Sequence, residues 1–222
     1  MSAAVVVALG FTTNSNPRGN TTMSEPGTPD EAIAEVLAGN QRYVKRMNES
    51  QNIVIDRAAL AAGQAPFAAV IRCADSRVAP EICFDQQLGR LFVCAVAGNI
   101  PTPEIIASLE FGVAVLGTKA IVIMGHSSCG AVDAAIKHRK DTSVLPGSLP
   151  MLIDQIVSPC AMKVDPSSKD ALDIAIECNA NMGVDELVRR SPIIADAVKD
   201  GSLKIIAGVQ DLKSGKFTVT RK

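Results

Sequence analysis

Two stretches of the sequence decide the fold, and they read FAAVIRCADSR over residues 67–77 and AIVIMGHSSCG over residues 120–130. Each opens with a short, continuous apolar run of the kind that forms a strand buried on both faces of a sheet. The first run, residues 67–71, leads to Cys73, and the second, residues 120–124, leads to Gly125 and His126. Each strand therefore delivers chemically distinctive side chains to its carboxyl end.

Helical and strand patterns alternate along the rest of the chain. The helical patterns cover residues 30–46, 103–116, 130–139, 149–161 and 167–190, and further strands are expected at 91–97 and 203–209. A turn at 213–216 followed by an edge strand at 217–220 predicts a final hairpin. This order predicts an α/β fold, in which helices flank both faces of a mostly parallel sheet and an antiparallel strand forms its C-terminal edge.

The composition excludes several classes of protein. The 222 residues carry 22 basic and 23 acidic side chains, a formal net charge of −1, so no polyanion-binding surface is indicated. Trp is absent, and one Tyr and six Phe supply few rings for stacking on bases. We therefore expect no nucleic-acid partner.

The N-terminal segment differs in character from the rest. The apolar run at residues 3–11 is too short to cross a bilayer, so no membrane association is expected. No basic residue precedes the run, which makes it a weak secretory signal. We interpret residues 1–29 as a flexible tail or a weak signal segment and residues 30–222 as a single domain. The expected location is the cytoplasm, with periplasmic export as the alternative.

The six cysteines do not indicate a disulfide scaffold, because a chain of this length has enough apolar residues to form a core. Most are expected to be reduced and buried. Cys83, Cys94 and Cys178 lie among apolar neighbours and are interpreted as small core residues. Cys73 and Cys129 differ, because short polar residues surround them.

The two unusual strand ends suggest a metal site. If the two strands are neighbours, Cys73, His126 and Cys129 converge and offer two thiolates and one imidazole. These are three of the four ligands of a tetrahedral zinc ion, and a free fourth position is typical of a catalytic site. The start of the helix at 130–139 is expected to favour the thiolate form of Cys129. The second histidine, His138, lies in a basic run that is typical of a surface.

Asp75 and Arg77 are two residues apart, so on an extended segment both side chains project to the same side and can pair. The Asp75 carboxylate could fill the fourth ligand position. Held away by Arg77, it could instead accept a hydrogen bond from zinc-bound water. A simple salt bridge in a loop is the remaining interpretation.

Together these residues resemble a family. The segments CADSRV at 73–78, AGN at 97–99, SLEF at 108–111 and GHSSCGA at 125–131 are similar to those of β-class carbonic anhydrases. The resemblance implies one zinc ion per subunit, with Cys73, His126 and Cys129 as its ligands and Asp75 and Arg77 as the catalytic pair.

The resemblance also implies a substrate pocket and an assembly. Gln64 matches the amide that binds bicarbonate, and Phe92, Ile100 and Phe111 match apolar pocket residues, part of the lining coming from the partner subunit. The implied fold is a Rossmann-like sheet whose opening helix embraces a second subunit, in a homodimer or dimer of dimers. Ala95 departs from the family, which commonly has arginine there, and this puts subunit contacts or the support of the Asp75 segment in question.

The expected activity is the reversible hydration of carbon dioxide to bicarbonate and a proton. Because two thiolates offset the zinc charge, the rate is expected to rise into the alkaline range. Two alternatives remain: a carbonyl sulfide or carbon disulfide hydrolase using the same site, and a non-catalytic zinc protein in which Asp75 closes the fourth position. A dinucleotide-binding turn and a Cys-x-x-Cys redox motif are both missing from the sequence.

Overall fold

A computed structural model describes residues 25–45, 57–157 and 159–222. Within these residues, five strands form one sheet in the order β2-β1-β3-β4-β5. The strands are β1 (Ala68–Arg72), β2 (Leu91–Ala95), β3 (Ala120–His126), β4 (Lys204–Gln210) and β5 (Phe217–Arg221). The first four are parallel and β5 runs antiparallel to β4, which confirms the predicted α/β fold with its antiparallel edge.

The central strands are buried on both faces, as their continuous apolar sequences predict. Along β1, Ala68 and Val70 belong to one core cluster and Ala69 and Ile71 to the other. Because successive side chains of a strand point to opposite faces, the two clusters lie on opposite sides of the sheet. Every residue of β3 is buried, including His126 at its end.

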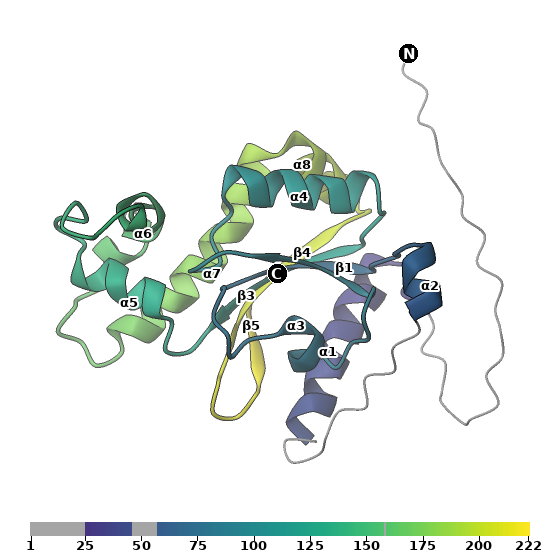
Figure 1. Cartoon of the computed structure of the whole chain (residues 1–222), viewed down its shortest axis with the longest axis horizontal. Coiled ribbons are helices and arrows are strands. Elements are labelled where there is room, and N and C mark those ends of the chain that lie inside the picture. The colour runs from purple at the N-terminus through teal and green to yellow at the C-terminus, as the bar shows by residue number, and fades with distance from the viewer. Residues whose placement is uncertain (1–24, 46–56, 158) are drawn as a thin grey trace.

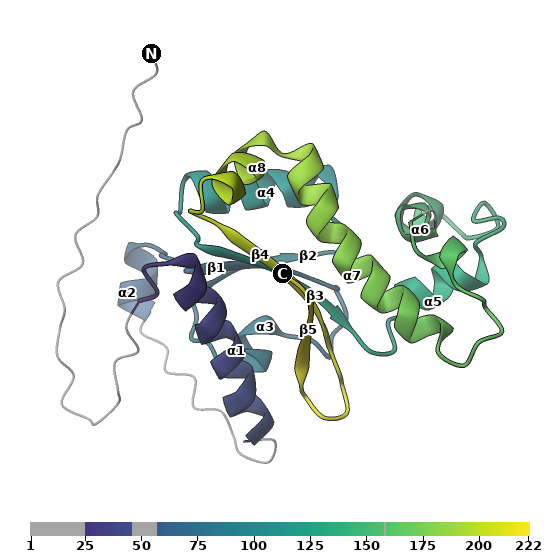
Figure 2. The ribbon, with the colours of Figure 1, turned by 180° about the vertical axis from the view of Figure 1, so that it is seen from behind.

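Helices cover both faces of this sheet (Figure 1, Figure 2). On one side lie α4 (Pro103–Ala114), α8 (Pro192–Lys199) and the later part of α7 (Ala171–Arg190), and on the other lie α1 (Pro29–Lys45) and α3 (Pro80–Cys83). Beyond the carboxyl end of β3, α5 (Gly130–Lys137) and α6 (Leu149–Val157) pack with the first part of α7 into a projecting lobe. The remaining helices are α2 (Arg57–Ala62) and the 3₁₀ turn Ala161–Lys163.

Several strands and helices end at residues other than those predicted. The strand expected at 120–124 continues to His126, and the one expected at 91–97 ends at Ala95. The helix expected at 149–161 ends at Val157, two residues before Pro159, because proline cannot continue the hydrogen-bonded ladder. The α8 helix was not expected, although Ser191 caps it by accepting a hydrogen bond from the Ile194 N–H and Pro192 occupies its first turn.

One cysteine prediction is wrong. Cys178 is not a free core residue but forms a disulfide with Cys160, with an S–S distance of 2.06 Å. The first part of α7 packs back against the segment that follows α6, and this brings the two sulfurs together although they are 18 residues apart in the sequence. Cys83 and Cys94 are free and buried, as expected.

The predictions for the start of the chain lie largely outside the described residues, which begin at residue 25. The first helix begins at Pro29, one residue before the expected start of the domain. In the part of the chain that the structure describes, no helix has the length and apolar character that a bilayer crossing requires.

Candidate metal centre

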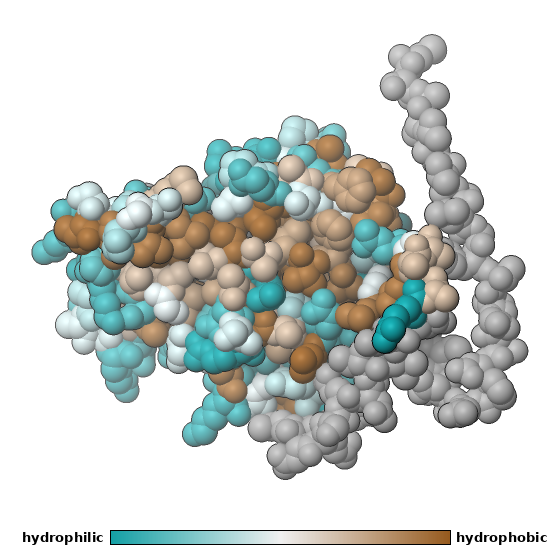
Figure 3. All heavy atoms as spheres, viewed as in Figure 1, coloured by the Kyte–Doolittle hydropathy of each residue, from teal (hydrophilic) through white to brown (hydrophobic). Residues whose placement is uncertain are grey.

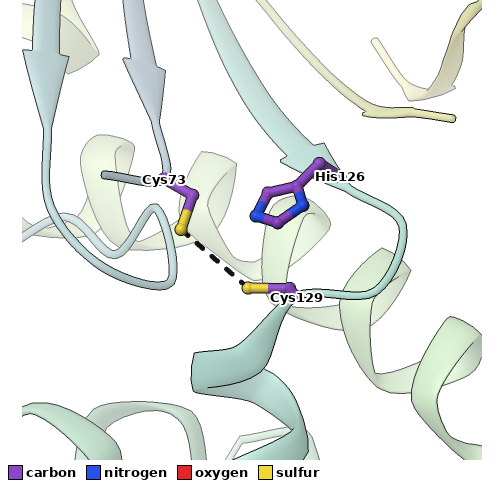
Figure 4. A group of neighbouring side chains, drawn as sticks. All are labelled: Cys73, His126 and Cys129. Carbon is purple, nitrogen blue, oxygen red and sulfur yellow. Dashed lines mark hydrogen bonds between the residues drawn. The ribbon is translucent and has the colours of Figure 1, made fainter. Parts of the chain in front are cut away.

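Three side chains converge at the carboxyl ends of β1 and β3. Cys73 follows β1, His126 is the last residue of β3, and Cys129 immediately precedes α5. Since β1 and β3 are paired neighbours, their ends meet, and one ligand atom from each residue lies within 4.8 Å of the other two (Figure 4). All three residues are buried.

The distances and donor types fit a zinc ion. The sulfurs of Cys73 and Cys129 are 4.0 Å apart, close to the separation of about 3.8 Å that two Zn–S bonds of about 2.3 Å give at a tetrahedral angle. His126 Nδ1 lies 2.9 Å from the Ser127 carbonyl oxygen, a contact in which Nδ1 donates its proton. Nε2 then carries a lone pair, as a metal-binding imidazole requires.

His126 Nε2 supports the same assignment. The side chain is fully buried, and among the described residues Nε2 has no hydrogen-bond partner. Buried polar atoms are seldom left unsatisfied, and an orphaned ring nitrogen beside two thiols is explained by a metal.

Of the two cysteines, Cys73 loses its proton more readily. The hydrogen bond from Cys129 lowers the pKa of Cys73 to about 4, and the same contact raises the pKa of Cys129. Hydrogen bonds from backbone N–H groups of α5 lower the pKa of Cys129, as predicted for a cysteine at the start of a helix. The neighbouring Cys73 thiolate raises this pKa by more than the helix lowers it. Burial lowers the pKa of His126, but the Cys73 sulfur and the Ser127 carbonyl together raise it.

Backbone groups hold the first ligand. The Gly98 N–H donates a hydrogen bond to Cys73 Sγ at 3.3 Å. The turn that carries Gly98 is attached to the ligand segment, since the Ala74 N–H donates to the Val96 carbonyl oxygen at 3.2 Å. Gly98 has a φ of +79°, a conformation that favours glycine.

The turn after His126 is held by the hairpin between β4 and β5. The Ser127 N–H donates to the Gln210 carbonyl oxygen at 2.9 Å, and Ser127 Oγ accepts a hydrogen bond from the Leu212 N–H at 2.9 Å. Ser127 is therefore fixed on both sides while its carbonyl orients the His126 ring. Sequence reasoning missed this support, because it depends on backbone contacts with a distant hairpin.

Asp75 and Arg77 pair as predicted, but in a turn rather than on an extended segment. Asp75 Oδ1 accepts hydrogen bonds from the Arg77 N–H at 2.9 Å and from Arg77 Nε at 2.8 Å, and Asp75 Oδ2 accepts one from Nη2 at 2.6 Å. A bond from an aspartate to the backbone two residues later is the usual reason for such a turn. The Arg77 hydrogen bonds hold the pKa of Asp75 well below its ordinary value.

The pair lies beside the three ligands. Asp75 Oδ2 is 3.8 Å from His126 Nε2, and Arg77 Nη2 also donates to the Ser128 carbonyl oxygen at 3.3 Å, between the second and third ligands. The Asp75 segment is further held by Arg72, which donates to the Asp75 carbonyl oxygen at 3.4 Å. Ala95, which stands where the family commonly has arginine, is exposed at the end of β2.

The predicted pocket residues are separated in a single chain. Ile100 is buried in the same core cluster as Cys73 and Cys129. Phe92 packs against the cluster on the other face of the sheet, with its ring centroid 6.3 Å from that of the half-exposed Phe111. Gln64 is exposed just before β1.

Comparison with known proteins identifies relatives of this sequence. A family model described as carbonic anhydrase matches residues 68–217. Carbonic anhydrase 2 of Mycobacterium tuberculosis is 37% identical over 189 residues, covering 85% of this chain and 91% of the relative. A carbonic anhydrase of Pseudomonas aeruginosa is 36% identical over 166 residues, covering 71% of this chain and 74% of the relative.

Solved structures agree with the sequence relatives. A Coccomyxa β-carbonic anhydrase in complex with acetazolamide has a TM-score of 0.67 at 27% identity, covering 86% of each chain. A structure from a study of two tetrameric β-carbonic anhydrases of Sordaria macrospora has a TM-score of 0.66 at 25% identity, covering 85% of this chain and 96% of the other. These matches confirm the resemblance seen in the sequence, and the chain belongs to the β-class carbonic anhydrase family.

Proposed function

We propose that this protein catalyses the reversible hydration of carbon dioxide to bicarbonate and a proton, with zinc held by Cys73, His126 and Cys129. The observation that carries the proposal is the set of three buried ligands with the Asp75 carboxylate held beside them by Arg77. When bound, zinc acts as a Lewis acid that makes a water molecule nucleophilic near neutral pH.

Asp75 is the proposed orienting group for the attacking water. Because Arg77 lowers its pKa, the carboxylate is ionised and can only accept hydrogen bonds, so it fixes the proton of the water and directs the oxygen lone pair at carbon. Arg77 keeps the carboxylate in place, and Arg77 is itself held by its hydrogen bond to the Ser128 carbonyl oxygen, in the turn between His126 and Cys129. Arg77 is therefore a positioning residue.

A second copy of the chain completes the proposed pocket. Ile100 lies on the metal side of the sheet, whereas Phe92 packs on the opposite side. We therefore propose that Phe92, Phe111 and Gln64 line the pocket at the metal of the partner subunit. An apolar wall suits a small, linear, uncharged substrate, and the Gln64 amide is suited to holding an oxygen of the product.

The surface is consistent with such a homodimer. Apolar residues form a band across one face of the molecule (Figure 3). Phe111 and Val115 at the end of α4 and Met151 on α6 are among the large apolar side chains that are exposed. Apolar patches of this kind mark interaction sites. The tetrameric relatives of Sordaria macrospora support a dimer or a dimer of dimers.

The disulfide provides evidence about the cellular compartment of the protein. Disulfides persist in oxidising compartments and are rare in the reducing cytosol. The bond between Cys160 and Cys178 thus supports the export alternative over the cytoplasmic expectation. Trapping thiols directly in cells tests this, since a cytoplasmic protein is expected to expose both cysteines to alkylation and an exported one neither.

The substrate is tested by comparing three small molecules. The zinc-loaded protein is assayed for hydration of carbon dioxide and for hydrolysis of carbonyl sulfide and carbon disulfide under identical conditions. We expect carbon dioxide to be hydrated fastest, at a rate that rises into the alkaline range. A strong preference for either sulfur compound would assign the site to that substrate instead, and no reaction of the zinc-loaded protein with any of the three compounds would support the non-catalytic alternative.

A further inference from the structure

Asn179 lies on α7 and is 5% exposed. Its Nδ2 donates a hydrogen bond to the Gly98 carbonyl oxygen at 2.7 Å, across 81 residues of sequence. This is a short, buried contact between a side-chain amide and a turn that belongs to no helix or strand. Asn179 thus fixes the orientation of the peptide that follows Gly98.

The same glycine contacts a zinc ligand. The Gly98 N–H donates to Cys73 Sγ, so Gly98 receives a hydrogen bond at its carbonyl oxygen from Asn179 and gives one from its amide to the sulfur. A hydrogen bond to a thiolate orients the ligand and adjusts its charge. The two bonds form a continuous path from α7 to the metal centre.

We propose that Asn179 is a positioning residue for the zinc ligand Cys73, acting through Gly98. Fixing the Gly98 carbonyl restricts rotation of the turn and keeps the amide aimed at the sulfur. The inference rests on the zinc site of the proposed function, but it does not depend on which substrate that site hydrates.

The turn at Gly98 is held from α6 as well as from α7. Ile156 packs against Gly98 from α6, so the turn is held between α6 and α7. The Cys160 N–H donates to the Ile156 carbonyl oxygen, and Cys160 is cross-linked to Cys178, the residue before Asn179. The disulfide therefore joins the two segments that hold Gly98.

Truncation of Asn179 is expected to release the turn. Asn179 lines a cavity of about 350 Å³ together with Ile100 and Pro101, so a shorter side chain leaves space in which the Gly98 carbonyl can turn to water. Loss of a group that is hydrogen-bonded directly to a metal ligand typically weakens metal binding about 10- to 100-fold, and the effect of Asn179, which acts through Gly98, is expected at the lower end of this range.

The test measures metal binding in Asn179→Ala and Asn179→Leu. The alanine variant removes the side chain, and the leucine variant keeps a similar volume but has no N–H donor. We expect both to bind zinc about 10-fold more weakly than the unaltered protein. In the cobalt-substituted proteins we expect the thiolate-to-metal charge-transfer band to shift, because the hydrogen bond to the Cys73 sulfur is lost.

Asn181→Ala is the matched control. Asn181 lies on the same helix and accepts a hydrogen bond from Thr220 Oγ1 at 2.6 Å, away from the turn at Gly98. Loss of thermal stability without any change in zinc affinity or in the cobalt spectrum of the Asn179 variants would overturn the inference, because that is the result of a purely structural role. Failure of the unaltered protein to bind zinc would instead overturn the proposed function.

Discussion

An alanine at Gly98 would place its Cβ atom 2.6 Å from Ile156 Cδ1 and 3.3 Å from Ala131 Cβ, on a backbone with a φ of +79°. Both the contact and the conformation disfavour any side chain. We predict that Gly98→Ala lowers the free energy of unfolding by about 2–4 kcal/mol and weakens zinc binding. Chemical denaturation and zinc competition with a chelator measure the two effects.

Gly117→Ala is the control for this prediction. Gly117 has a similar φ of +70°, but an added Cβ meets nothing within 4 Å. Only the conformational cost of about 1–2 kcal/mol is expected, with no change in zinc affinity. Equal zinc affinity in the two variants would show that the Gly98 turn does not support the metal centre.

Asp75→Asn tests the role of the carboxylate. An amide cannot make the two-oxygen pairing with Arg77 and cannot act only as an acceptor, so we predict a loss of at least about 100-fold in carbon dioxide hydration with zinc content unchanged. Asp133→Asn is the matched control, since Asp133 forms an exposed pair with Lys137 at 2.5 Å on α5. Loss of zinc from the Asp75 variant would identify the carboxylate as a metal ligand and favour the non-catalytic alternative.

At the level of elements, the disulfide joins α7 to the segment after α6. A cross-link between residues 18 apart is expected to stabilise the fold by about 3 kcal/mol, chiefly by restricting the unfolded chain. We predict that the Cys160→Ser, Cys178→Ser double variant unfolds at lower denaturant concentration. The unaltered protein in a thiol reductant should unfold at the same denaturant concentration as this variant. A reductant should not lower that concentration further for the variant. A melting curve of the unaltered protein that is insensitive to complete reduction would contradict the prediction.

The sequence predicts the elements whose pattern is local. The runs at 67–71 and 120–124 are continuous and apolar, and the structure confirms both strands. The disulfide was missed because pairing of Cys160 with Cys178 depends on how α7 packs, and spacing alone does not show this. The α3 helix was missed because its four residues are too few for a periodic pattern.

Some residues of the candidate site can also be predicted from the sequence, and others cannot. Cys73, His126 and Cys129 could be proposed from sequence because cysteine and histidine at strand ends are chemically distinctive. The contacts made by Ser127 and Asn179 could not, because polar residues of their type are common and their partners are backbone groups of distant segments.

At the scale of the whole molecule, the proposed sharing of the pocket between subunits predicts complementation. Cys129→Ser should lack zinc and Gln64→Ala should lack the substrate amide, so each variant is expected to have low activity alone. In a mixed dimer of the two variants, one of the two sites has the intact zinc ligands of the Gln64→Ala chain and the intact Gln64 of the Cys129→Ser chain. Random exchange makes about half of the dimers mixed, so about one quarter of the unaltered activity should return. No recovery in verified mixed dimers would show that Gln64 acts within its own chain.

The most direct measurement is bound zinc and carbon dioxide hydration in the intact protein beside Cys129→Ser. Cys94→Ser is the control, because Cys94 is also buried but packs in the core cluster on the opposite face of the sheet. We predict stoichiometric zinc and activity in the intact protein and in Cys94→Ser, and loss of both in Cys129→Ser. Hydration by Cys129→Ser at the unaltered rate would contradict the assignment of the metal centre.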